Sequence, residues 1–113
     1  MAEDLEILQG TLDLLVLKAL SIGPMHGYAV SRFIRQRSLE NLTVQDGALY
    51  AALHRLEAQK LVVAHWGVSA KGKRAKYYQL NSLGLRRLRE ATDKWSRYSG
   101  AVNSVLETAA GFT

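Results

Sequence analysis

Two short segments with alternating apolar and polar residues, separated by a basic loop that contains glycine, occupy the middle of this sequence. The first, residues 61–66, is rich in valine and ends in Trp66, and the second covers residues 74–80. Alternating β-branched and aromatic residues predict strands, and a glycine-bearing loop between two strands predicts a hairpin. An isolated hairpin is only marginally stable in water. The rest of the chain must therefore supply helices against which this hairpin packs.

Two helical segments open the chain. Residues 12–22 are apolar on nearly every side of a helix, which is typical of a buried central helix. Thr11 is expected to cap its start, and Gly23 to end it in the left-handed conformation. A second helix follows to about residue 38. His26 is interpreted as the N-terminal cap of that helix and not as a metal ligand, because no second ligand lies nearby in the sequence.

A third helical segment precedes the hairpin and is apolar on one side only. Its leucines recur at helical spacing and predict a buried stripe: Leu49, Leu53 and Leu56. Thr43, followed three residues later by Asp46, resembles a capping box that would begin the helix. The opposite face is small and polar, so it is better suited to lie against a partner than to be buried. That face consists of Gly47, Tyr50, Ala51, His54 and Arg55.

Composition narrows the class of protein. A chain of 113 residues with 48% hydrophobic residues and a mean hydropathy of -0.09 fits one globular domain. The absence of cysteine excludes a disulfide framework and thiol chemistry. No apolar run reaches the roughly 18 residues of a membrane span, and the acidic start is unlike a secretion signal, so we expect a cytoplasmic protein. No nucleophile elbow, phosphate loop or metal-ligand spacing is present, so we expect neither an enzyme nor a cofactor or metal.

Positive charge is concentrated in the second half of the chain. The net charge is +5 and the pI is about 9.7, yet residues 1–13 carry only acidic charges. This asymmetry predicts a polyanionic partner. The cations expected at the tip of the hairpin are Lys71, Lys73, Arg74 and Lys76. The basic residues that follow them are interpreted as a solvated helix face.

Three helices followed by a basic hairpin are the element order of a winged helix-turn-helix. We therefore predict a mainly α (α+β) fold in which the third helix enters the major groove of double-stranded DNA and the two-stranded wing touches the backbone. Base edges carry sequence information and phosphates supply affinity, so the two sets of contacts are assigned separately. The predicted base contacts are Gln45, Tyr50, Ala51 and His54. The predicted backbone contacts are Tyr28, Arg32, Thr43, Arg55, Lys71, Lys73, Arg74, Lys76 and Tyr77.

The longest predicted helix covers residues 82–110, with Ser82 as its cap. Apolar residues recur along it at every seventh position, a spacing that favours packing against another helix. At about 40 Å it would extend beyond the small domain. We therefore expect a homodimer that presents two third helices to a pseudo-palindromic operator, with residues 1–81 as the DNA-binding domain and 82–113 as the dimerisation helix. The predicted interface residues are Leu12, Leu15, Leu88, Trp95, Tyr98, Val102, Val105 and Leu106.

Several motifs together resemble the PadR family of bacterial transcriptional regulators. They lie at residues 10–17, 23–28, 47–50, 53–57, 66–69 and 74–80. The resemblance extends over about residues 8–84, and the single C-terminal helix is similar to that of the shorter members. It implies a DNA-binding homodimer of the bacterial cytoplasm and nucleoid, usually a repressor, that in many members releases DNA when a small aromatic or xenobiotic effector binds. Ala51 stands where the family commonly has proline, which predicts a straighter third helix.

The sequence is compatible with more than one role for some aromatic residues and with more than one class of function. Trp95 either stacks on a planar effector in a pocket between subunits or simply anchors the interface, and we favour the anchor. Trp66 is expected to anchor the core or an interface, and His65 to be structural or phosphate-facing. Two other classes of function are compatible with the pattern. A winged helix used only for protein interaction would dimerise without salt-dependent DNA binding, and a small-molecule-binding dimer would take up ligand without DNA.

Overall fold

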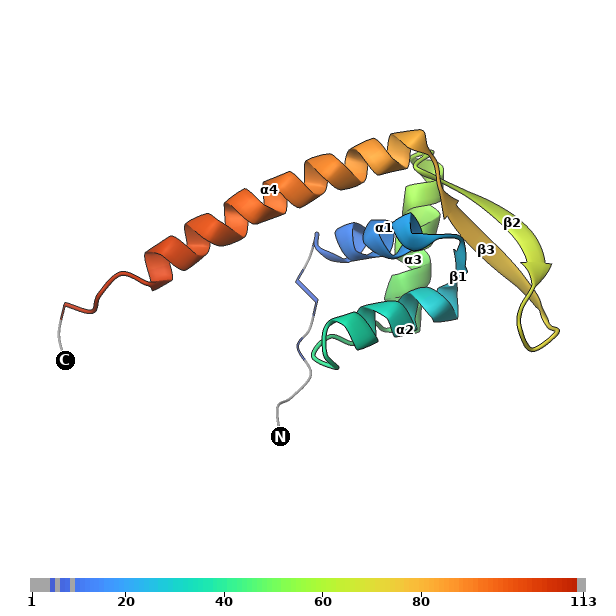
Figure 1. Cartoon of the computed structure of the whole chain (residues 1–113), viewed down its shortest axis with the longest axis horizontal. Helices are drawn as coiled ribbons and strands as arrows, with labels where there is room; N and C mark the ends of the chain where they lie inside the picture. The colour runs from blue at the N-terminus through green and yellow to red at the C-terminus, as the bar shows by residue number, and fades with distance from the viewer. Residues whose placement is uncertain (1–4, 6, 9, 112–113) are drawn as a thin grey trace.

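In the computed structural model, the helices and the hairpin follow one another as the sequence predicts (Figure 1). The structure describes residues 5, 7, 8 and 10–111. Its elements are α1 (Leu12–Ile22), β1 (Met25–His26), α2 (Gly27–Arg37), α3 (Asp46–Ala58), β2 (Val62–Val68), β3 (Arg74–Leu80) and α4 (Ser82–Leu106). This order confirms the predicted winged helix-turn-helix with a long C-terminal helix.

The core lies where α1 meets the other helices and the sheet. The predicted stripe of α3 is buried, since Leu49, Leu53 and Leu56 are at most 1% exposed. Burial of a leucine side chain contributes about 1.5–3 kcal/mol, so this stripe holds the orientation of α3 firmly. On α1 the buried residues are Val16, Leu17, Ala19 and Leu20. The hairpin adds Tyr78, which confirms that it packs on the helices.

The sheet contains one strand that the sequence did not predict. β2 and β3 form the expected antiparallel hairpin, with Val62 opposite Leu80 and Val68 opposite Arg74. The two-residue strand β1 pairs with the other edge of β3, so the sheet order is β1-β3-β2. A strand of two residues is too short to have a recognisable alternation. Its pairing ties the start of α2 to the hairpin.

Of the three helix ends predicted for α1 and α2, one has the expected cap hydrogen bond. Gly23 adopts an extended conformation, with φ 162° and ψ 174°, so its predicted left-handed conformation is wrong; the chain must be extended here to enter β1. Thr11 occupies the cap position of α1, but its hydroxyl donates to the Leu8 carbonyl at 2.6 Å and does not cap an amide. His26 does cap α2, because its Nδ1 accepts a hydrogen bond from the Ala29 amide at 3.2 Å.

The other two predicted caps are wrong by one or more residues. α3 begins at Asp46 with Gln45 at the cap position, so Thr43 does not occupy the cap position that the pattern predicted. α4 begins at Ser82, but the cap is Asn81, whose Oδ1 accepts a hydrogen bond from the Gly84 amide at 2.8 Å. The Asn81 amide group also donates to the Lys60 carbonyl at 2.7 Å, which joins the start of α4 to the end of α3. Such a non-local partner is invisible in a local sequence pattern.

α4 packs on the domain only through its first turns and then projects away from it (Figure 1). Gly84 and Leu88 are the buried residues of this helix. The projection explains the elongated shape, with a longest extent of 61 Å. No helix in the described part of the chain is long and apolar enough to cross a membrane.

Candidate nucleic-acid interface

A groove of about 720 Å³ lies between the start of α2, the outer face of α3 and one face of the wing. We call it the wing groove, with the wing defined as β2, β3 and the loop 69–73 between them. It is lined by His26, Gly27, Tyr28, Ala29, Arg32, Tyr50, His54, Trp66, Ser69, Ala70, Lys71, Arg74, Ala75, Lys76 and Tyr78. The structure thus brings together seven of the predicted contact residues, Tyr28, Arg32, Tyr50, His54, Lys71, Arg74 and Lys76.

The side chains that α3 presents to this groove are Tyr50 and His54. Both point outward because the leucines on the other side of the helix are buried in the core. Tyr50 is 43% exposed, so its hydroxyl can form hydrogen bonds with a partner. α3 is one uninterrupted helix through Ala51. An uninterrupted helix with a hydrogen-bonding tyrosine and histidine on its open face can lie in a major groove.

The start of α2 forms the second wall of the wing groove. The cap by His26 and the pairing of β1 with β3 hold this helix start in place. Tyr28 is largely exposed, and the guanidinium carbon of Arg32 lies 5.7 Å from the centre of its ring. This wall therefore offers one phenol and one cation beside the face of α3.

The tip of the wing is ordered by Ser69. Its amide donates to the Lys73 carbonyl at 2.7 Å, and its hydroxyl oxygen accepts a hydrogen bond from the Lys73 amide at 3.2 Å. Gly72 has a φ of 78°, a conformation that side chains disfavour, which lets the loop close within five residues, 69–73. Lys71 and Lys73 are exposed on this closed loop.

The wing face that borders the groove carries an aromatic and cationic cluster. Trp66, Arg74 and Lys76 lie on this face, with Trp66 directly opposite Lys76 in the sheet register. The guanidinium carbon of Arg74 lies 4.3 Å from the centre of the Trp66 ring. Trp66 is 58% exposed, so of its two expected roles, anchor of the core or of an interface, the core is excluded. The sequence already placed Trp66 in the strand that pairs with the basic strand. Only the register of the two strands shows that Arg74 is the residue that contacts it.

Other predicted contact residues lie outside the wing groove. Thr43, Gln45, Ala51 and Arg55 line a neighbouring groove of about 450 Å³, which α3 forms with the N-terminal segment. Tyr77 lies on a strand position adjacent to Lys76 and Tyr78, so its side chain points to the opposite face of the sheet. There its hydroxyl donates to the Val68 carbonyl at 3.3 Å and its ring stacks on His65 at 6.0 Å.

Arg55 is engaged within the domain. Its Nε and Nη2 atoms lie 3.1 and 2.5 Å from the two carboxylate oxygens of Asp13 on α1. These hydrogen bonds and the negative charge of Asp13 raise the pKa of Arg55. The guanidinium thus stays charged and oriented toward α1. Of the predicted backbone contacts, Lys76 is also partly engaged, with its Nζ 3.8 Å from Glu57 Oε1.

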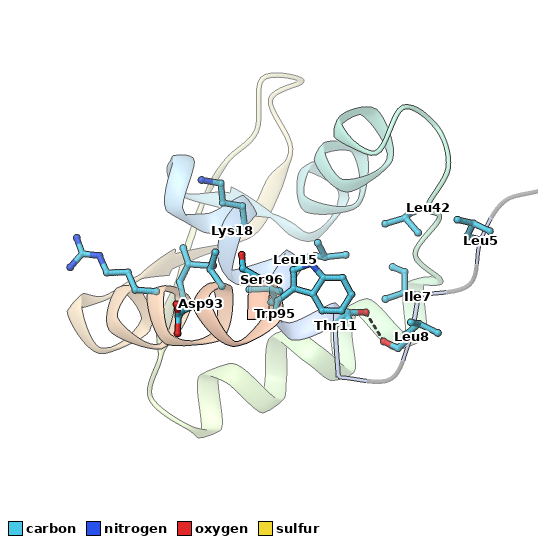
Figure 2. Close-up of a pocket in the computed structure, with 14 residues that line it drawn as sticks. Leu5, Ile7, Leu8, Thr11, Leu15, Lys18, Leu42, Asp93, Trp95 and Ser96 are labelled. Carbon is cyan, nitrogen blue, oxygen red and sulfur yellow. Dashed lines mark hydrogen bonds between the residues drawn. The ribbon is translucent and has the colours of Figure 1, made fainter. Parts of the chain in front are cut away.

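A third, apolar groove of about 1000 Å³ lies between the N-terminal segment, α1 and α4. We call it the α1–α4 groove. Figure 2 shows the indole of Trp95 beside Thr11 and Leu15, with Ile7, Leu8 and Leu42 across the groove. Its charged residues are Lys18, Arg89 and Asp93. The predicted interface residues Leu15, Leu88 and Trp95 line it, and Trp95 is 40% exposed.

The remaining predicted interface residues of α4 form no part of the core. Their exposed fractions are 63% for Tyr98, 41% for Val102, 73% for Val105 and 74% for Leu106. Leu12 is half-buried at the start of α1. The single chain therefore leaves an apolar seam of α4 open to solvent.

Comparison with known proteins agrees with this architecture. The profile of the transcriptional regulator PadR-like family matches residues 16–90. A PadR family transcriptional regulator from Eggerthella lenta is 34% identical, with a TM-score of 0.75 over 89% of this chain and 86% of that one. A PadR-like transcriptional regulator from Bacillus cereus is 28% identical, with a TM-score of 0.77 over 89% of this chain and 96% of that one.

A further relative is an uncharacterised protein of Lysinibacillus sphaericus, which is 28% identical over 90% of this chain and 94% of its own length. The family profile covers more than half of the chain and includes α2, α3 and the wing, the elements that build the wing groove. The expectation of a regulator and not an enzyme agrees with this match. The chain belongs to the PadR-like family of transcriptional regulators.

Proposed function

We propose that this protein is a homodimeric repressor that binds a pseudo-palindromic operator through the wing groove and is released by a small planar effector. The observation that carries the DNA-binding part is the gathering of Tyr50 and His54 from α3 with Arg32, Lys71 and Arg74 in one groove. The hydrogen-bonding side chains on the helix can contact base edges in the major groove, and the cations beside them can contact the phosphates along its borders.

We propose different roles for the residues in and beside the wing groove. Tyr50 and His54 are the proposed base contacts, because they point out of the helix that would enter the groove. Lys71, Lys73 and Arg74 are the proposed phosphate contacts, because they are exposed on the wing. Arg55 is left out of this set, because its guanidinium is already paired with Asp13.

The test of DNA binding separates these two tasks. Lys73→Ala or Arg74→Ala should weaken binding to all duplexes alike and lower the slope of log K against log salt by about 1. Tyr50→Ala or His54→Ala should instead reduce the preference for a selected duplex by about 1–3 kcal/mol. Lys94→Ala on α4 makes the same change in charge away from the wing groove and serves as the control. If neither kind of variant changed the affinity for DNA, the proposal would be wrong.

The proposed homodimer rests on the open seam of α4. Val102, Val105 and Leu106 are exposed in the single chain, although they are apolar and lie on one long helix. Association of this helix with its counterpart in a second copy would remove that surface from water. A two-fold dimer of this kind would repeat the wing groove, as a pseudo-palindromic operator requires.

The proposed effector site is the α1–α4 groove. Its apolar lining and the half-exposed indole of Trp95 suit a planar aromatic compound, which could stack on that ring. The chain has two tryptophans, so Trp66→Phe leaves Trp95 as the only indole. Titration of this variant with planar aromatic compounds should quench the fluorescence of Trp95 and weaken DNA binding. No quenching across a broad panel would exclude the effector site.

A further inference from the structure

The indole of Trp66 is exposed on the wing and is not part of the core. Trp66 stands opposite Lys76 in the register of β2 and β3, and Val68 stands opposite Arg74. Trp66 and Arg74 are therefore diagonal neighbours on the same face of the wing, a spacing that long and aromatic side chains can bridge. That face borders the wing groove.

The guanidinium of Arg74 lies over the ring of Trp66. The guanidinium carbon of Arg74 lies 4.3 Å from the ring centre of Trp66, well within the range of a cation–π interaction. The other pairs of this kind among the described residues are longer, at 5.5 Å for Lys76 and Tyr78, 5.7 Å for Arg32 and Tyr28, and 5.9 Å for Arg37 and Phe33. A guanidinium in a cation–π contact still has N–H groups that can donate hydrogen bonds to a partner.

Among the described residues Arg74 has no anionic partner, in contrast to Lys76 on the same face of the wing. Among the described residues, Arg55 pairs with Asp13, Arg35 with Glu40, Arg97 with Asp93, and Lys76 lies near Glu57. No carboxylate or hydrogen-bond acceptor in the described part of the chain engages the guanidinium of Arg74. The cation is thus held in place by a ring while its hydrogen-bond donors remain unused.

We infer that Trp66 is a positioning residue, which holds the guanidinium of Arg74 in place to bind a DNA phosphate from the wing. Arginine loses side-chain entropy when it binds a phosphate, and a ring that already restricts it reduces that loss. A guanidinium held in this way still has N–H donors with the spacing that matches phosphate oxygens. The inference rests on the proposed DNA-binding function and assigns Trp66 no direct contact with bases.

The experiment is a double-mutant cycle on the full chain, with a mixed-sequence DNA duplex as the probe. Trp66→Leu keeps an apolar side chain but removes the ring, and Trp66→Phe keeps a ring. We expect Trp66→Leu to weaken binding about two- to fivefold and to reduce the salt slope in part, while Trp66→Phe retains most of both. Arg74→Ala should reduce the slope by about 1, and Trp66→Leu should have no further effect in the Arg74→Ala background.

The outcomes separate this inference from the proposed function. If the effects of Trp66→Leu and Arg74→Ala add fully, Trp66 acts independently of Arg74 and the inference is overturned, whereas salt-dependent binding by the unaltered chain still supports DNA binding. An affinity loss with an unchanged salt slope in Trp66→Leu would also overturn it, because that pattern indicates a merely structural role. Thermal unfolding of each variant identifies any loss of fold. If the unaltered chain shows no salt-dependent binding, the proposed function fails as well.

Discussion

The ring of Tyr50 on α3 lies directly against the backbone of Gly27 at the start of α2. A Cβ atom at Gly27 would lie 2.8 Å from the hydroxyl oxygen of Tyr50 and 2.9 Å from two of its ring carbons. These distances are too short for atoms that are not bonded. A side chain at residue 27 and the present position of Tyr50 therefore exclude each other. Gly27 sets the place of a proposed base contact that it does not itself make.

Gly27→Ala should displace the Tyr50 ring and leave the fold intact, because the clash involves the free end of a movable side chain. The ratio of affinities for a selected duplex and a mixed-sequence duplex should fall toward that of Tyr50→Ala, within about 1–3 kcal/mol. Gly23→Ala is the matched control, since a Cβ at Gly23 meets nothing within 4 Å. A Gly27→Ala variant that keeps its full sequence preference while Tyr50→Ala loses it would contradict this prediction.

Arg55→Gln should affect stability and not the contact with DNA. The pair with Asp13 is half-exposed, and pairs of this kind contribute at most about 1 kcal/mol to the free energy of unfolding. Asp13→Asn should cost a similar amount in chemical denaturation. Neither change should alter the salt slope of DNA binding, in contrast to Arg74→Ala. A lower slope for Arg55→Gln but not for Asp13→Asn would instead make Arg55 a phosphate contact.

Gly84→Ala should destabilise the junction between α4 and the sheet. A Cβ at Gly84 would clash with the Leu61 carbonyl oxygen and lie 2.7 Å from Leu80 Cδ1, and the backbone atom cannot move aside without shifting the chain next to β2. We expect a loss of about 1–3 kcal/mol in the free energy of unfolding, measured by denaturant titration. Gly100→Ala on the same helix meets nothing within 4 Å and should instead stabilise by up to about 1 kcal/mol. Equal stabilities for the two variants would rule out the close packing of Gly84.

Val102→Glu should separate the proposed dimer into folded monomers. Val102 is apolar and exposed in the single chain, and a carboxylate there could not be buried against a second helix without a large cost. Asn103→Glu adds the same charge at the adjacent exposed position of α4 and should leave the dimer intact. Sedimentation gives the mass, and circular dichroism confirms the fold. A Val102→Glu variant that remains a dimer would exclude this seam as the interface.

The sequence determined the four helices, the hairpin and their order, because hydrophobic periodicity records which side of each of these elements is buried. The spacing of Leu49, Leu53 and Leu56 predicted both the burial of that stripe and the outward position of Tyr50 and His54. The alternation in residues 74–80 predicted β3 with the bounds that the structure has. These are local properties, so neighbouring residues suffice to reveal them.

Only the tertiary structure decided which residues from separate elements meet. Arg55 forms hydrogen bonds with Asp13, which lies 42 residues away in the sequence. Asn81 donates to the carbonyl of Lys60, and β1 pairs with β3 although two helices and β2 separate them in the sequence. The register of two strands, and not their composition, brings Trp66 to Arg74, and the packing of α2 on α3 places Gly27 under Tyr50. Such contacts depend on how buried faces pack in three dimensions, and a periodic pattern identifies the faces without identifying their partners.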